Sequence, residues 1–162
     1  MKVHIGKYPK NSKKERKISV NIDSWDTWNM DSTLALIILP MLKQLKEQKG
    51  GAPFVDMNDV PEHLRAEIKD GETDDLHFAR WDYVLDEMIF AFESYFNDWE
   101  DNFWKTKPEL DFSEHPEDEG EYIKPVRWKV EGDCDWDGMR KYQERIQNGL
   151  RLFGTYYSGL WS

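Results

Sequence analysis

Residues 75–99 read DLHFARWDYVLDEMIFAFESYFNDW, and this stretch decides the fold. Its large apolar residues recur at alternating steps of three and four, which places them on one face of an α-helix. They are Phe78, Trp81, Leu85, Met88, Phe92, Tyr95 and Trp99. Val84, Ile89 and Phe96 widen this face, so we predict a long central helix that packs on more than one side.

A second helix is predicted over residues 31–48, where apolar residues again follow helical spacing. The predicted buried stripe consists of Leu34, Ile37, Ile38, Met41, Leu42 and Leu45. Asp31 or Ser32 can cap the start of this helix, because either side chain can accept from unpaired backbone N–H groups. Pro40 lies inside the segment and predicts a kink or a break.

A further helix is predicted over residues 136–157, and a short one over 60–68 with Asp59 as its cap. The buried face of the longer helix is predicted to carry Met139, Tyr142, Ile146, Leu150, Phe153 and Tyr157. Gly149 and Gly154 lie on or beside this face, and residues this small permit a close helix approach.

The N-terminal segment favours strands rather than helices. Residues 2–6 and 16–22 alternate apolar and polar side chains, a pattern typical of β-strands. Because two strands alone are marginally stable, the hairpin must lie on the helices or pair with another chain. We therefore predict an α+β, mainly helical fold. Three or four helices pack around a long central aromatic helix, with a small N-terminal antiparallel β-hairpin.

A chain of 162 residues predicts a single domain, 1–162. Within it we expect a basic β-hairpin at 1–22, a helical core at 31–99, and a C-terminal helix and tail at 137–162. Residues 100–136 are rich in acidic residues and predict an irregular excursion, in which 122–130 is the candidate for a short strand or hairpin arm.

Charge is divided unevenly along the chain. Residues 1–22 hold seven Lys or Arg and one Glu, a net charge of +6, whereas the remainder carries −16 of the total of −10. Such an acidic body disfavours bulk nucleic-acid binding, because the phosphate backbone requires cations. Cys134 is the only cysteine, which excludes an internal disulfide and a cysteine-based zinc site. No apolar run is long enough to span a membrane.

Motifs of the common enzyme classes are missing from the sequence. It contains no GxxxxGK[ST], GxGxxG, HExxH or GxSxG pattern, so we expect no cofactor. Carboxylates are the remaining candidates, since their oxygens suit Mg²⁺ or Mn²⁺. The weak metal candidates are Asp26, Asp31, Asp82 and Asp86. The alternative for Asp82 and Asp86 is a solvated helix face, because they lie opposite the apolar stripe.

The segment IDSWDTWNMD (22–31) combines aromatic and acidic residues next to the basic hairpin. Trp25 and Trp28 can plug the entry to the following helix. Alternatively, they form a stacking platform for a base, with basic residues holding its phosphate. The predicted ligand-binding residues are then Lys13, Lys14, Arg16, Trp25, Asp26, Trp28, Arg127 and Trp128.

Four segments resemble a family of small uncharacterised proteins encoded by tailed bacteriophages. They are KISVNIDSWDTWNMDSTLALIILPMLKQLK (17–46), GAPFVDMNDVPEHLR (51–65), HFARWDYVLDEMIFAFE (77–93) and RIQNGLRLFGTYYSGLW (145–161). The resemblance is weakest in 1–16 and 94–144. It implies a phage gene product that acts in the host bacterial cytoplasm, and it implies no catalytic residue.

This setting favours a non-enzymatic binding protein in phage–host conflict, one that captures a small nucleotide immune signal. A first alternative is an acidic protein that binds and inhibits a host protein by mimicking nucleic acid. A second alternative is a metal-dependent enzyme with an Asp cluster. The expected partner is accordingly a small nucleotide or a host protein, and a homo-oligomer is compatible with either.

Overall fold

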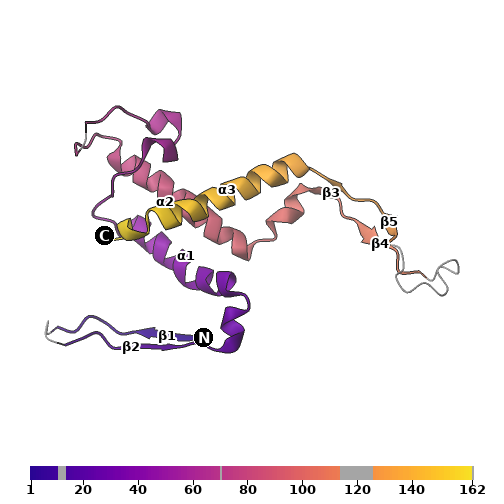
Figure 1. The fold of residues 1–162 in the computed structure, drawn as a ribbon, viewed down its shortest axis with the longest axis horizontal. Helices are drawn as coiled ribbons and strands as arrows, with labels where there is room; N and C mark the ends of the chain where they lie inside the picture. Colours follow the sequence, from indigo (N-terminus) through magenta and orange to yellow (C-terminus); the bar gives the residue numbers. More distant parts are fainter. Residues whose placement is uncertain (11–13, 70, 114–125, 162) are drawn as a thin grey trace.

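The computed structural model describes residues 1–10, 14–69, 71–113 and 126–161, and it confirms the α+β, mainly helical class (Figure 1). Its helices are α1 (Met30–Gln48), α2 (His77–Glu93) and α3 (Trp136–Thr155). α1 continues without a break through Pro40, so the predicted break there is wrong.

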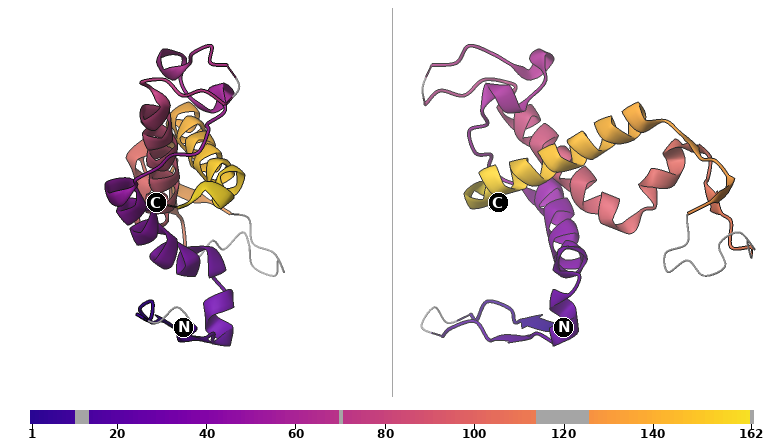
Figure 2. Two further views of the ribbon diagram at one scale, coloured as in Figure 1. Left: turned by 90° about the vertical axis from the view of Figure 1, so that its left-hand side faces the viewer. Right: turned by 45° about the vertical axis from the view of Figure 1, so that its right-hand side comes forward.

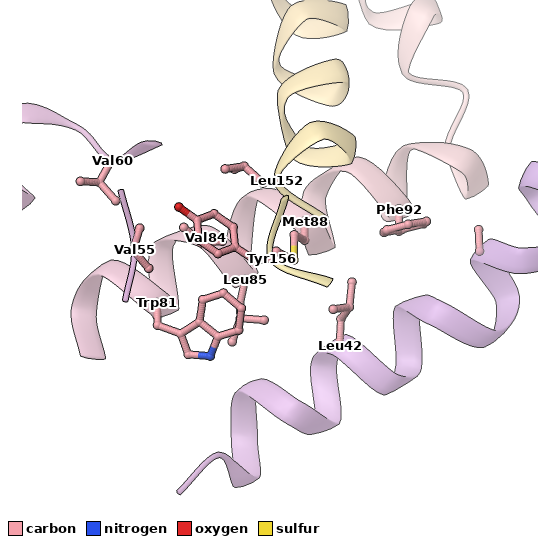
Figure 3. Packing of buried hydrophobic residues seen from close by; sticks show 11 residues of the cluster. Leu42, Val55, Val60, Trp81, Val84, Leu85, Met88, Phe92, Leu152 and Tyr156 are labelled. Atoms are coloured by element: carbon pink, nitrogen blue, oxygen red, sulfur yellow. The ribbon is translucent and has the colours of Figure 1, made fainter. Parts of the chain in front are cut away.

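α2 is the central element of the core and contacts both α1 and α3. Its buried apolar residues are Trp81, Val84, Leu85, Met88, Ala91 and Phe92. Figure 3 shows this cluster meeting Leu42 of α1 and both Leu152 and Tyr156 from the end of α3. The central aromatic helix is therefore confirmed, although its first predicted core residue, Phe78, is half-exposed.

α2 ends at Glu93, six residues before the predicted end. Just beyond it, Ser94 Oγ donates to a carbonyl of the last turn at 2.7 Å, and Asn97 Nδ2 donates to the Glu93 carbonyl at 3.0 Å. Such side chains compete with the helical hydrogen bonds of the backbone. The chain continues in two short 3₁₀ helices, η4 (Ser94–Phe96) and η5 (Trp99–Phe103).

Three ion pairs join α1, together with Lys49 at its C-terminal cap, to α2. They are Lys43–Glu93, Lys46–Asp86 and Lys49–Asp82. The pairs run in opposite sequence order, since the first lysine binds the last of the three acidic residues of α2. The two helices are therefore antiparallel. Asp82 and Asp86 are partly solvated, as the sequence alternative proposed, but they also bind lysines, which the periodicity of α2 alone did not indicate.

α2 and α3 approach each other closely at Gly149. A Cβ atom at this position would lie 2.3 Å from the Glu87 carbonyl oxygen and 2.6 Å from Ala91 Cβ. At Gly154 a Cβ would meet nothing within 4 Å, so the predicted close approach is confirmed for Gly149 only. Beside the crossing, Arg145 Nη2 donates to the buried carboxylate of Glu87 at 2.7 Å, which raises the pKa of Arg145.

The connector between α1 and α2 is tied to α2 through Arg80, a side chain only 2% exposed. Its guanidinium donates to both carboxylate oxygens of Asp74, at 2.7 and 2.5 Å, and to the Leu64 carbonyl at 2.7 Å. The hydrogen bonds from Arg80 lower the pKa of Asp74.

The short helix predicted over 60–68 is also wrong. Only the 3₁₀ helices η2 (Met57–Asp59) and η3 (Glu62–Leu64) form in this part of the connector. Asp59 binds the C-terminal helix instead of capping: Tyr156 Oη donates to Asp59 Oδ2 at 2.7 Å, and Arg151 Nη2 donates to Oδ1 at 2.6 Å. Burial, and then the hydrogen bond to Asp59, raise the pKa of Tyr156 to about 12.

Two slender projections leave this helical body at different places (Figures 1 and 2). The first is the predicted N-terminal hairpin, in which β1 (Lys2–Ile5) pairs antiparallel with β2 (Ile18–Asn21). The second, which we call the arm, holds β3 (Trp104–Thr106), β4 (Glu109–Leu110), β5 (Trp128–Val130) and β6 (Asp133–Cys134), paired as β3–β6 and β4–β5.

The arm corrects the prediction of an irregular excursion over 100–136, and β5 lies in the part, 122–130, that was the candidate for a short strand or hairpin arm. Within the described residues this segment holds η5 and two antiparallel strand pairs, while 114–125 lie outside the described residues. Each strand has only two or three residues, which is too short for a period-two pattern to stand out in the sequence.

Candidate functional site

The N-terminal hairpin has one apolar face that the rest of the chain leaves exposed. Its register pairs Val3 with Val20 and Ile5 with Ile18, so these four branched side chains lie on the same face. All four are exposed, from 41% at Val3 to 64% at Ile18. Of the two arrangements predicted for the hairpin, packing on the helices therefore fails to cover this face, and pairing with another chain stays a prediction.

Trp25 and Trp28 follow the hairpin at the 3₁₀ helix η1 (Ser24–Thr27). Their rings stack on each other, with centroids 5.5 Å apart and planes inclined by 10°. They are 72% and 74% exposed, so the predicted hydrophobic plug at the entry to α1 is wrong. η1 brings the two rings together in solvent instead of burying them against the helix.

Two aspartates fix η1. Asp23 Oδ1 accepts from the Trp25 amide at 3.3 Å, and Asp26 Oδ2 accepts from the Asp23 amide at 2.7 Å, which forms a capping box. Asp26 also binds the N-terminal amine of Met1 at 2.7 Å. This hydrogen bond, followed by that from Asp23, lowers the pKa of Asp26. The stacked tryptophans therefore have carboxylates close to them.

α1 adds further exposed apolar side chains. Its buried face is rotated from the predicted stripe and contains Ala35, Ile38, Leu39, Leu42 and Leu45. The side chains left exposed are Met30, Leu34, Leu36 and Met41. Of the 23 exposed large hydrophobic residues in the described chain, 13 lie in residues 1–41. We call these side chains of the hairpin, η1 and α1 the N-terminal surface.

Seven of the eight residues predicted to bind a ligand are described, and they are not brought together. Trp25, Asp26 and Trp28 lie at η1, Lys14 and Arg16 lie at the far end of the hairpin ladder, and Arg127 and Trp128 lie on the arm. Lys13 lies outside the described residues. Arg16 is held inside the hairpin, where its guanidinium donates to the Gly6 carbonyl and lies 4.3 Å from the centroid of the Tyr8 ring.

The four aspartates considered as metal ligands are already engaged with other groups of the chain. Asp26 binds the N-terminal amine, and Asp31 Oδ1 accepts from the Ser32 amide at 2.8 Å. Asp82 and Asp86 bind lysines of α1. Among residues 1–10, 14–69, 71–113 and 126–161, no group of three or more His, Cys, Asp or Glu is placed to hold a metal ion.

Sequence reasoning missed a cluster of aromatic side chains on the arm. Trp104, Trp128 and Trp136 line one cavity there, and only Trp128 was among the predicted site residues. They come from β3, from β5 and from the first position of α3, so no local spacing connects them. Only the pairing of the strands could reveal this cluster.

Comparisons with known proteins identify no relative of this chain. The chain matches no protein-family model, and no curated protein or solved structure matches it. Within the described residues, no helix is both long and apolar enough to cross a membrane.

Proposed function

We propose that this chain is a non-enzymatic binding protein that docks onto another protein through its N-terminal surface. The observation that carries this proposal is the exposed apolar face formed by Val3, Ile5, Ile18 and Val20. A two-stranded sheet is marginally stable by itself, and an apolar face in water is typical of a surface that another chain covers.

The partner is expected to be apolar where it meets the hairpin and acidic around that area. Residues 1–22 carry a net charge of +6, so the hairpin that bears the apolar face is basic. Complementary charge would accelerate the encounter and fix its orientation. A partner strand can also pair with the outer backbone edge of β1 or β2, since each strand has only one neighbour.

The resemblance to tailed-phage proteins supplies a setting for this proposal. In that setting the protein acts in phage–host conflict inside the bacterial cytoplasm, and the partner is a host protein. Capture of a small nucleotide has less support, because Lys14 and Arg16 stand apart from the tryptophan pair, and Asp23 and Asp26 lie beside it.

Mimicry of nucleic acid likewise has less support. A mimic needs a row of unpaired carboxylates along one face. The acidic residues of α2 that face α1, namely Asp82, Asp86 and Glu93, are each bound to a lysine of α1.

A second copy of the chain also fits the expected partner chemistry, because the rest of the chain carries −16. An apolar groove of about 660 Å³ lies between α1 and the C-terminal end and contains Met41, Leu45, Tyr157 and Trp161. It is a place where the hairpin of another copy could bind, so the test must separate self-association from binding to a host protein.

A photo-cross-linking amino acid placed at Ile18 tests this function, with Ser19 as the matched control on the opposite face of the same strand. In bacterial cells that express the protein, we expect the cross-linker at position 18 to form an adduct with one defined chain. The cross-linker at position 19 should give little product. The mass of the adduct identifies either a second copy or a host protein. Equal products from both positions, or none from either, would contradict docking through the apolar face.

A further inference from the structure

The arm contains a cavity of about 420 Å³ whose walls are mostly indole rings. It is lined by Trp104, Pro108, Trp128, Glu131, Gly132 and Trp136. This cavity lies away from the N-terminal surface, at the β-strands of the arm and the start of α3. Binding in this cavity would therefore not depend on the proposed function of the N-terminal surface.

Two of the rings meet at a steep angle and form a corner. The centroids of Trp104 and Trp136 are 5.4 Å apart, and their planes are inclined by 77°. Gly132 allows this arrangement, because a Cβ there would lie 2.6 Å from the Trp104 ring and 3.0 Å from Pro108. Trp128 is 52% exposed, so the third ring is not simply part of a buried core.

The single charged residue in the lining of this cavity is Glu131. It has no ion-pair partner among the described residues. The nearby lysines of the arm are already engaged, since Lys105 pairs with Asp133 and Lys129 pairs with Glu109. An anionic ligand would therefore meet an unfavourable potential, whereas a cation would be attracted.

We infer that this cavity binds an organic cation that carries methyl groups, such as a quaternary ammonium. The faces of aromatic rings are negative, so several indoles around one cation attract it while their apolar surface accommodates the methyl groups. Glu131 supplies the formal countercharge. A bare divalent metal ion does not fit this lining, because it requires several oxygen ligands and Glu131 is the single carboxylate there.

Choline and its neutral isostere 3,3-dimethylbutan-1-ol provide the direct test, since they differ in charge but hardly in shape. Each is titrated into the full-length protein, and the indole N–H signals of the eight tryptophans are followed by NMR. We expect saturable shifts from Trp104, Trp128 and Trp136 with choline, and binding of the neutral isostere weaker by about three- to tenfold. A peptide with a trimethylated lysine, run in parallel, distinguishes a protein side chain from a small molecule as the source of the cation.

Substitutions separate the contribution of charge from that of shape. Glu131→Gln keeps the shape of the cavity lining and should weaken choline binding several-fold without changing the other tryptophan signals. Trp128→Leu should weaken it further, and Trp25→Leu, outside the cavity, should leave it unchanged.

The inference would be overturned by equal affinity for choline and the neutral isostere. It would also be overturned if neither choline nor the trimethyl-lysine peptide shifted the three indole signals at millimolar concentration. Glu131→Gln leaves the packing of the arm intact. It therefore tests the inference even if Trp128→Leu fails to fold.

Discussion

Tryptophan and lysine have different environments in the helical body and in the N-terminal projection, which here means the hairpin together with Trp25 and Trp28. In the body, Trp81 is fully buried beneath Tyr156, whereas Trp25 and Trp28 of the projection stand 72% and 74% exposed. Lysines of α1 bind carboxylates of α2, whereas residues 1–22 hold a surplus of positive charge. The body thus buries its largest aromatic side chain and pairs its lysines with carboxylates, while the projection leaves apolar and basic groups exposed.

The largest expected effect separates the tryptophans of these two regions. Trp81→Ala should lower the free energy of unfolding by about 3–5 kcal/mol, because it removes the largest fully buried side chain and leaves a cavity. Trp25→Ala should change it by less than about 0.5 kcal/mol. Urea denaturation followed by far-UV circular dichroism measures both variants. Equal costs would mean that the projection belongs to the folded core.

A pair of glycines on α3 tests the body at finer scale. Gly149→Ala forces a methyl group against the Glu87 carbonyl and should cost about 1–3 kcal/mol. Gly154→Ala meets nothing within 4 Å and should stabilise the helix by up to about 1 kcal/mol. Thermal melting of the two variants should therefore shift in opposite directions. If both melting temperatures shifted in the same direction, the close approach of α2 and α3 would not lie at Gly149.

The smallest of these effects concerns the Tyr156–Asp59 hydrogen bond. Tyr156→Phe should cost about 1 kcal/mol at neutral pH. The pKa of Tyr156 is raised to about 12, so the contribution of the neutral phenol is complete below the ordinary value of 10.0 and is lost as pH rises through 12. The difference in denaturation midpoint between the two proteins should therefore shrink above pH 10. If the difference in denaturation midpoint stayed constant up to pH 12, the hydrogen bond between Tyr156 and Asp59 would be contradicted.

Much of the helical architecture was predictable because periodicity reports directly on burial. The alternating steps of three and four in 75–99 located α2 and identified Trp81, Leu85, Met88 and Phe92 as core residues. The hairpin was predictable for a similar reason, since Ile18 and Val20 alternate with polar residues along β2.

The periodicity was less informative where two faces of a helix are both apolar. α1 has apolar residues nearly all around, and the predicted stripe therefore placed Leu34 and Met41 inside, where the structure exposes them. Just after α3 the neighbouring tyrosines presented the same ambiguity: Tyr157 was predicted to be buried, but Tyr156 is the one that packs against Trp81. A rotation by one residue changes little in the sequence pattern but decides which ring enters the core.

The candidate sites depended still more on long-range contacts. The predicted ligand residues looked adjacent because several of them follow one another along the chain, yet the extended hairpin separates Arg16 from Trp25. Conversely, Trp104 and Trp136 are 32 positions apart in the sequence, and the pairing of β3 with β6 brings them together.

By itself, the sequence determined the mainly helical class, the central aromatic helix, the N-terminal hairpin and the division into a basic segment and an acidic remainder. These are properties of local spacing and composition, which each segment carries wherever it lies. Only the tertiary structure decided that the apolar face of the hairpin and the Trp25–Trp28 pair stay exposed, that lysines at α1 bind α2, and that three tryptophans line one cavity. Exposure and contact depend on which distant segments come to lie beside a residue, and packing of the whole chain fixes that arrangement.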